Sequence, residues 1–231
     1  MKKLLGEKAI GILLYYFNPE LRASWGGPFN AQEFRQQIFL EIIDKIKFAF
    51  IAETGTFRGT TTEFLSSKSG LAVYTSEISP RFYSYSKARF LFNGKIKPYE
   101  GDSRAFLKKV LSNSLTSNPA FFYLDAHWKD DLPLKEEVEI IFSRCPQAVI
   151  MIDDFKVPFD SGYTYDNYGD GKELSLEYLA PIKHLNFSAF FPAGSSVQET
   201  GYKRGSVVLA KDNDMITKLT ECKTLKLYKI S

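Results

Sequence analysis

The segment Phe48-Ala-Phe-Ile-Ala-Glu-Thr-Gly-Thr-Phe-Arg-Gly59 joins an apolar run to a turn that contains two glycines. The run is short enough for a buried strand, and the threonine run and apolar pair that follow indicate the start of a helix. Strand, glycine turn and helix form the nucleotide-binding arrangement of open parallel sheets, because glycine lets the backbone approach a ligand and the helix start offers free N–H groups. A plain strand-to-helix turn has the same pattern, so the rest of the chain decides between the two.

The glycine spacing bears on the kind of ligand. Gly55 and Gly59 are separated by three residues, and Glu53 lies two residues before the first glycine. Dinucleotide enzymes carry Gly-x-Gly-x-x-Gly instead, in which the second glycine makes room for a pyrophosphate. The spacing therefore disfavours a nicotinamide-dependent dehydrogenase.

Strand-like runs alternate with helical stretches over the next hundred residues. We expect strands at 72–77, 96–102, 120–125 and 148–154, and helices at 81–92, 103–111 and 134–143. This alternation predicts a parallel sheet, and Pro98, which cannot donate to a ladder, places its strand at an edge. Two further runs, 188–191 and 206–210, have no helix between them and predict an antiparallel pair. Residues 1–17 and 34–46 look helical.

Each expected parallel strand ends at an acidic residue: Glu53, Glu77, Asp102, Asp125 and the pair Asp153-Asp154. These positions share one edge of the sheet, and the carboxyl edge is where open α/β sheets bind ligands. Any single acid could instead cap the next helix. Glu77 is placed to accept hydrogen bonds from ribose hydroxyls, and Asp102, beside Ser103, from an adenine amino group. Oxygen ligands such as Asp125, Asp153 and Asp154 suit Mg²⁺ or Ca²⁺ better than zinc.

Composition sets the broad class of the protein. The 231 residues are 44% hydrophobic and 25% charged, as in ordinary globular chains. This length predicts a single domain over 1–231. The order of the expected elements divides it into a helical cap at 1–47 and a core at 48–210. The net charge of +3, with lysines spread out, predicts no nucleic-acid partner, and no run is long enough to span a membrane. Cys145 and Cys222 form no disulfide framework, and Glu7 interrupts the basic, apolar start, so we predict a cytoplasmic protein rather than a secreted one.

Glu-x-Gly-x-x-x-Gly, with the acids at later strand ends, resembles the class I S-adenosylmethionine (SAM)-dependent methyltransferases from about Phe48 to Ala210. The resemblance implies an α/β fold: a Rossmann-like, doubly wound, mostly parallel seven-stranded sheet with an antiparallel final hairpin and N-terminal helices. It also implies SAM as the cofactor. The cofactor-binding residues expected are Glu53, Thr54, Gly55, Thr56, Gly59, Thr60, Glu77, Asp102, Ser103 and Asp125.

Leu124-Asp-Ala-His-Trp-Lys-Asp130 and Met151-Ile-Asp-Asp-Phe155 are similar to motifs of metal-dependent catechol-type O-methyltransferases and of related enzymes that methylate natural-product sugars. The match implies that Asp125, Asp153 and Asp154 hold Mg²⁺ and that Lys129 is the catalytic base. It also implies that Trp128 and Pro158 line the acceptor pocket. Ala126 is an extra residue before His-Trp-Lys, and Asp154 replaces an asparagine, so His127 is kept as a second candidate for the base.

Methyl transfer from SAM to a hydroxyl is the function that these features favour. A bound cation lowers the pKa of a hydroxyl acceptor, and a nearby base removes its proton. The partner expected is a small hydroxylated molecule, and a homo-oligomer is left open. Three alternatives stand beside this hypothesis: a metal-independent methyltransferase, a nicotinamide-dependent dehydrogenase, and a non-catalytic module that keeps the cofactor pocket.

Overall fold

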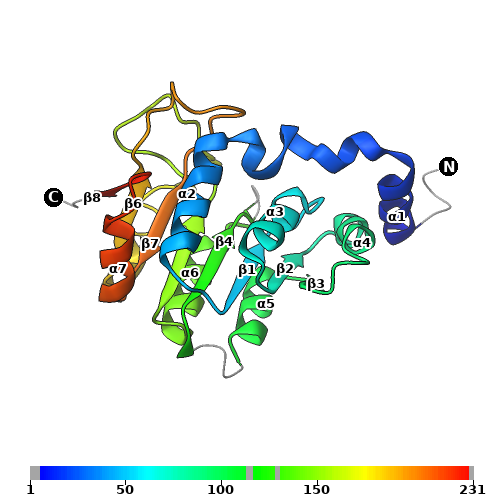
Figure 1. Cartoon of the computed structure of the whole chain (residues 1–231), viewed down its shortest axis with the longest axis horizontal. Coiled ribbons are helices and arrows are strands. Elements are labelled where there is room, and N and C mark those ends of the chain that lie inside the picture. The colour runs from blue at the N-terminus through cyan, green and yellow to red at the C-terminus, as the bar shows by residue number, and fades with distance from the viewer. Residues whose placement is uncertain (1–5, 113–116, 128–130, 229–231) are drawn as a thin grey trace.

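The computed structural model describes residues 6–112, 117–127 and 131–228 of the chain (Figure 1). A single sheet runs through them in the order β3-β2-β1-β4-β5-β7-β6-β8. β1 (Phe50–Thr54) has β2 (Val73–Glu77) and β3 (Ile96–Glu100) on one side, and β4 (Ala120–Leu124) and β5 (Ala148–Ile152) on the other. These strands all pair in parallel, as predicted.

The other half of the sheet is antiparallel. β7 (Val207–Ala210) pairs with β5, and β6 (Ser188–Pro192) pairs with β7, which confirms the predicted hairpin. β8 (Leu225–Tyr228) adds to the outer side of β6, so the sheet has eight strands where seven were expected. β3 is an edge strand, as predicted. It can contain Pro98 because the outer side of an edge strand forms no ladder hydrogen bonds.

Helices cover both faces of the sheet. α2 (Glu33–Lys45), α3 (Thr60–Ser69) and α7 (Asn213–Thr220) pack on one face, and α5 (Ser103–Val110) and α6 (Leu134–Arg144) pack on the other (Figure 1). Every residue of β1, β4 and β5 is therefore buried. This is why these strands read as continuous apolar runs rather than as an alternating pattern.

The N-terminal segment runs along the carboxyl edge of the sheet. α1 (Glu7–Phe17) packs on α4 (Pro80–Arg89), where a Cβ on Gly11 would come within 2.1 Å of the Arg81 carbonyl oxygen. Two short 3₁₀ segments, η1 (Pro19–Gly26) and η2 (Pro28–Ala31), then lead to α2 (Figure 1). A third, η4 (Ala180–Leu185), precedes β6.

The start of α2 is capped by a residue that is distant in sequence. Gln32 is the N-cap residue and makes no capping hydrogen bond with its side chain. The Glu199 carboxylate, distant in sequence, accepts from the backbone N–H groups of Phe34 (3.0 Å) and Arg35 (3.2 Å) instead. A tertiary contact thus supplies the cap.

No helix in the described ranges combines the length and the apolar character that a bilayer crossing requires.

Candidate active site

A cavity of about 510 Å³ lies at the carboxyl ends of the parallel strands, where the sequence places the acids. Its volume is in the range of small-molecule sites. The η1–η2 segment forms one wall, through Ser24, Trp25, Gly27 and Asn30. The other lining residues are Glu53, Gly55, Thr56, Phe57, Arg58, Gly59, Thr60, Thr61, Glu77, Phe82, Asp125, His127, Asp154, Asp166, Tyr168, Tyr202 and Arg204.

The turn after β1 needs glycine because it packs against the end of β4. Gly55 has φ +85°, and a Cβ there would lie 2.3 Å from the Asp125 carbonyl oxygen. The N–H groups of Gly55 and Thr56 both donate to the Ser76 carbonyl at 3.0 Å, which holds the turn against β2. Gly59 also has a positive φ of +76°, at the start of α3. The backbone therefore forms the cavity wall, as a nucleotide-binding turn requires.

Glu53 is buried beneath this turn. One carboxylate oxygen accepts from the hydroxyls of Thr62 (2.5 Å) and Thr75 (2.6 Å). Burial raises the pKa of Glu53 to about 8, although these two hydrogen bonds oppose the shift. The side chain therefore retains its proton near neutral pH.

Glu77 lies at the end of β2, on the opposite side of the turn. Its two oxygens accept from the backbone N–H groups of Phe57 (2.7 Å) and Ser79 (2.8 Å). Burial raises the pKa of Glu77 despite these hydrogen bonds. The carboxylate thus fixes the glycine turn and also lines the cavity.

Three of the predicted cofactor residues are not among the described residues that line the cavity: Thr54, Asp102 and Ser103. The Asp102 carboxylate caps α5, where it accepts from the N–H groups of Arg104 (2.9 Å) and Ala105 (3.1 Å). It also pairs with the Arg104 guanidinium at 2.6 Å, and these hydrogen bonds lower the pKa of Asp102. Asp102 therefore caps a helix, which is the simpler alternative for an acid at a strand end. Its role in binding adenine stays a prediction.

A cluster of metal-ligand type forms where β4 and β5 end. Asp125, His127 and Asp154 each direct one ligand atom into it, and these atoms lie within 4.8 Å of one another. His127 Nε2 is 3.8 Å from Asp125 Oδ1 and 3.7 Å from Asp154 Oδ2, too far for hydrogen bonds. This nitrogen is buried and has no hydrogen-bond partner among the described residues.

The charges in the cluster act on one another. Burial raises the pKa of Asp125 to about 7. Burial alone would lower the pKa of His127, but the carboxylates of Asp154, Asp125 and Asp166 outweigh it and raise that pKa. Burial would raise the pKa of Asp154, but His127 and Arg204 hold it well below its usual range. Nearby positive charge thus favours the ionised form of Asp154, whereas burial disfavours the ionised form of Asp125.

Asp153 is not part of this cluster, contrary to the prediction that it holds a metal. Its Oδ1 pairs with the Arg35 guanidinium, and its Oδ2 accepts from the Tyr123 hydroxyl at 2.5 Å. Successive residues at the end of a strand point to opposite faces, and Arg35 of α2 holds Asp153 on the α2 face. His127 is the third member of the cluster instead.

Two further predictions concern the acceptor and the base. Lys129 and Trp128 lie outside the described residues, so their roles stay predictions. Pro158 is exposed and is not among the described residues that line the cavity.

Sequence reasoning missed two later residues that complete the site. Arg204 Nε donates to Asp154 Oδ1 at 2.6 Å, and Arg204 also pairs with Asp166. Asp166 Oδ2 lies 3.9 Å from His127 Nε2. The only signals in the sequence were the Gly-, Tyr- and Asp-rich loop near residue 166 and the Gly201–Gly205 turn.

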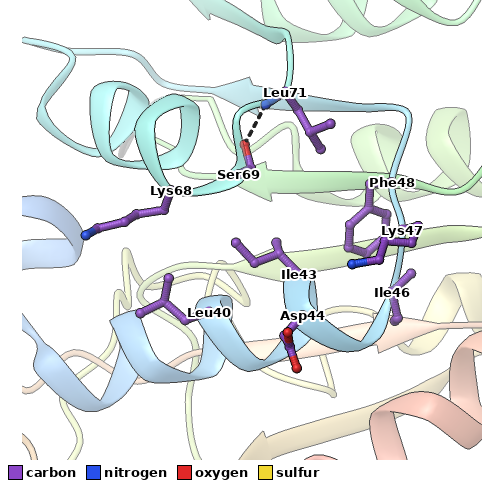
Figure 2. Close-up of a pocket in the computed structure, with 9 residues that line it drawn as sticks. All are labelled: Leu40, Ile43, Asp44, Ile46, Lys47, Phe48, Lys68, Ser69 and Leu71. Atoms are coloured by element: carbon purple, nitrogen blue, oxygen red, sulfur yellow. Dashed lines mark hydrogen bonds between the residues drawn. The ribbon is translucent and has the colours of Figure 1, made fainter.

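A second cavity of about 350 Å³ lies between α2 and the end of α3, near the start of β1 (Figure 2). Leu40, Ile43 and Phe48 line it together with Lys47 and Lys68, among others. Asp44 is its single carboxylate among the described residues. It lies away from the carboxyl ends of the strands, so the first cavity is the candidate site.

Neither a family model nor a curated protein matches the sequence. Solved structures do match the fold. An O-methyltransferase from Bacillus cereus in complex with S-adenosylhomocysteine (SAH) is 18% identical with a TM-score of 0.55, over 91% of this chain and 94% of that chain. The O-methyltransferase TomG from Streptomyces achromogenes, in complex with SAM, is 16% identical with a TM-score of 0.50, over 78% and 80%.

A third structure, MtNAS in complex with MTA and tNA, is 14% identical with a TM-score of 0.54, over 89% of this chain and 70% of that chain. At such identities the likeness concerns the fold, and the strand order and final antiparallel strands agree with it. The chain therefore has the Rossmann-like fold of the class I SAM-dependent methyltransferases.

Proposed function

We propose that this protein transfers a methyl group from SAM to a hydroxyl of a small molecule, with the help of a divalent cation. The observation that carries the proposal is that one cavity joins two kinds of site. Its first part holds the glycine turn, Glu53 and Glu77, and its second part holds Asp125, His127 and Asp154. A cofactor in the first part would present its reactive end to an acceptor in the second.

The first part of the cavity fits a nucleoside cofactor. The Gly55 turn brings the backbone to the cavity wall, and Thr60 and Thr61 at the start of α3 line the wall beside it. Glu77 is placed to accept from ribose hydroxyls, since one carboxylate oxygen can accept more than one hydrogen bond. SAM, when bound, supplies an electrophilic methyl group for in-line displacement, and the protein supplies position and electrostatics.

The second part of the cavity fits a cation. His127 Nε2 is buried and has no hydrogen-bond partner among the residues that the structure describes, and carboxylate oxygens surround it. A divalent cation at these residues would lower the pKa of an acceptor hydroxyl and orient it. Trp25 and Tyr202, in edge-to-face contact at 5.5 Å and each 55% exposed, would offer an apolar surface to the rest of the acceptor.

The base is proposed to come from the loop after β4. This loop carries Asp125 and His127, and it continues into Lys129. A base must reach the same hydroxyl that the cation holds, so a residue next to a ligand is well placed. Lys129 is retained for this role, because His127 Nε2 already faces the cluster.

Turnover with SAM and a panel of phenols and hydroxylated sugars tests the proposal. We expect SAH to form with at least one acceptor, and a chelator to abolish its formation. Turnover that survives chelation would identify a metal-independent methyltransferase. SAM binding with no SAH formed for any acceptor would instead favour a non-catalytic module.

A further inference from the structure

We propose that Asp166 is a fourth donor of the cation site, and that the site so completed binds a transition-metal ion such as Mn²⁺ in preference to Mg²⁺. The inference rests on the proposed cation at Asp125, His127 and Asp154, and it adds a residue and an ion class. Asp166 lies in the loop that follows β5, 12 residues after Asp154.

The first observation is the surroundings of His127 Nε2. Three carboxylate oxygens lie around this nitrogen: Asp154 Oδ2 at 3.7 Å, Asp125 Oδ1 at 3.8 Å and Asp166 Oδ2 at 3.9 Å. None is at hydrogen-bond distance, yet the residue is 8% exposed and its Nε2 has no partner in the described part of the chain. A buried imidazole nitrogen faced by three oxygens is the arrangement that a cation between them would satisfy.

Asp166 is held in this place by the fold. Its backbone N–H donates to the Asp154 carbonyl at 2.9 Å, and its carbonyl accepts from Leu174 N–H at 3.0 Å. Asp154 itself adopts a left-handed φ of +53°, which aspartate tolerates at a cost and which is typical of functional positions. The two carboxylates are therefore fixed side by side before any ligand arrives.

Arg204 leaves one oxygen of each carboxylate directed toward the cluster. Its Nε donates to Asp154 Oδ1 at 2.6 Å, and its Nη2 pairs with Asp166 Oδ1. The remaining oxygen, Oδ2 of each residue, is the one nearest His127. Partners in the outer shell orient metal ligands in this way. The Tyr168 hydroxyl also donates to Asp166 Oδ2, which still has acceptor capacity.

The donor set indicates the class of ion. Three carboxylates and one imidazole form a mixed oxygen and nitrogen site, whereas Mg²⁺ prefers oxygen ligands and retains several waters. Carboxylates suit Mg²⁺, Ca²⁺ and Mn²⁺ alike, whereas imidazole suits transition-metal ions such as Zn²⁺ and Fe²⁺, so the imidazole is the donor that favours a transition-metal ion here. The aspartate that would have made the set all-oxygen, Asp153, is engaged by Arg35.

The SAM-free full-length protein tests the inference with Mn²⁺ and Mg²⁺ as probes. Calorimetry should show one equivalent of Mn²⁺ bound more tightly than Mg²⁺. Pulsed electron paramagnetic resonance of the Mn²⁺ complex should show coupling to an imidazole nitrogen, which the His127→Asn variant should lack. Asp166→Asn should weaken Mn²⁺ binding by at least the roughly 10–100-fold that loss of a mere outer-shell partner costs.

Asp160→Asn is the matched control, because Asp160 lies in the same loop but hydrogen-bonds to Ser196 instead of the cluster. This variant should bind Mn²⁺ like the parent. The inference is overturned if Mg²⁺ binds as tightly as Mn²⁺, if the parent complex shows no nitrogen coupling, or if Asp166→Asn leaves Mn²⁺ binding unchanged. The first two readings use the parent protein alone, so they hold even if a variant fails to fold. Turnover of SAM by a protein that binds no cation would leave methyl transfer intact, and it would reject this inference together with the role of the cation in the proposed function.

Discussion

Arg35 of α2 and Asp153 at the end of β5 form an ion pair in which each side chain is only 1% exposed. The Arg35 guanidinium also donates to the carbonyl groups of Arg204 and Gly205. The Tyr123 hydroxyl donates to the second oxygen of the Asp153 carboxylate. This pair ties α2 to the sheet and to the turn that carries Arg204. It also explains why, of two adjacent aspartates, only Asp154 reaches the cluster.

Removal of one partner of this pair should destabilise the fold. Arg35→Met leaves Asp153 buried and uncompensated, which costs about 3–5 kcal/mol of unfolding free energy. Lys45→Met, on the same helix, is the control, because the Lys45 contact with Glu221 is long (3.8 Å) and lies at the surface. It should cost under about 1 kcal/mol. Urea unfolding measures both, and equal losses would contradict the role given to the buried pair.

The glycine turn gives a second prediction. Gly55→Ala should abolish SAM binding and lower stability, because its Cβ would meet the Asp125 carbonyl at 2.3 Å in a left-handed conformation. Gly169→Ala is the matched control, since Gly169 has a similar φ of +79° but no atom within 4 Å of the added Cβ. It should cost only the backbone strain, about 1–2 kcal/mol, and bind SAM normally. Similar behaviour of the two variants would show that the close approach to Asp125 has no role.

Glu77 gives a third prediction, on cofactor affinity. Glu77→Gln keeps an acceptor oxygen for one of the two backbone N–H groups, of Phe57 and Ser79, and loses the charge that strengthens hydrogen bonds from ribose. The loss should be about 1.5–3 kcal/mol, or roughly 10–150-fold in the Kd for SAM. Glu63→Gln, on α3 and paired with Arg89 rather than lining the cavity, should leave the Kd unchanged. Calorimetric titration of the two variants with SAM measures the difference.

A fourth prediction concerns pH. The pKa of Glu53 is raised from 4.5 to about 8 in the folded, ligand-free protein, chiefly by burial. The folded state therefore holds this proton more tightly, and the resulting stability is complete below pH 4.5 and lost as pH rises toward about 8. Relative to Glu53→Gln, the parent should lose about 1.4 kcal/mol per pH unit across this window. Parallel stability curves for the two proteins would show that Glu53 ionises normally.

Local patterns in the sequence predicted most of the fold. The apolar runs of β1, β4 and β5 were visible because both faces of those strands are covered, and Pro98 marked the edge. β8 was missed, since its four residues form a strand only through pairing with β6. The cap of α2 could not be predicted for a similar reason, because Glu199 is distant in sequence.

The site was predicted where it follows from the strand ends and missed where it depends on tertiary contacts. Glu53, Glu77 and Asp125 end strands and line the cavity as expected. Nothing local distinguishes Asp153 from Asp154, because Arg35 and Arg204, both remote in sequence, decide which carboxylate turns inward. Asp166 reaches the cluster through a backbone hydrogen bond to Asp154, which no spacing indicates.

Calorimetric titration of the parent protein and of Glu77→Gln with SAM, and of the parent with NAD, tests the central claim most directly. We expect the parent to bind one equivalent of SAM, Glu77→Gln to bind SAM more weakly, and NAD to give no heat. NAD binding without SAM binding, or equal SAM affinity of parent and variant, would contradict it.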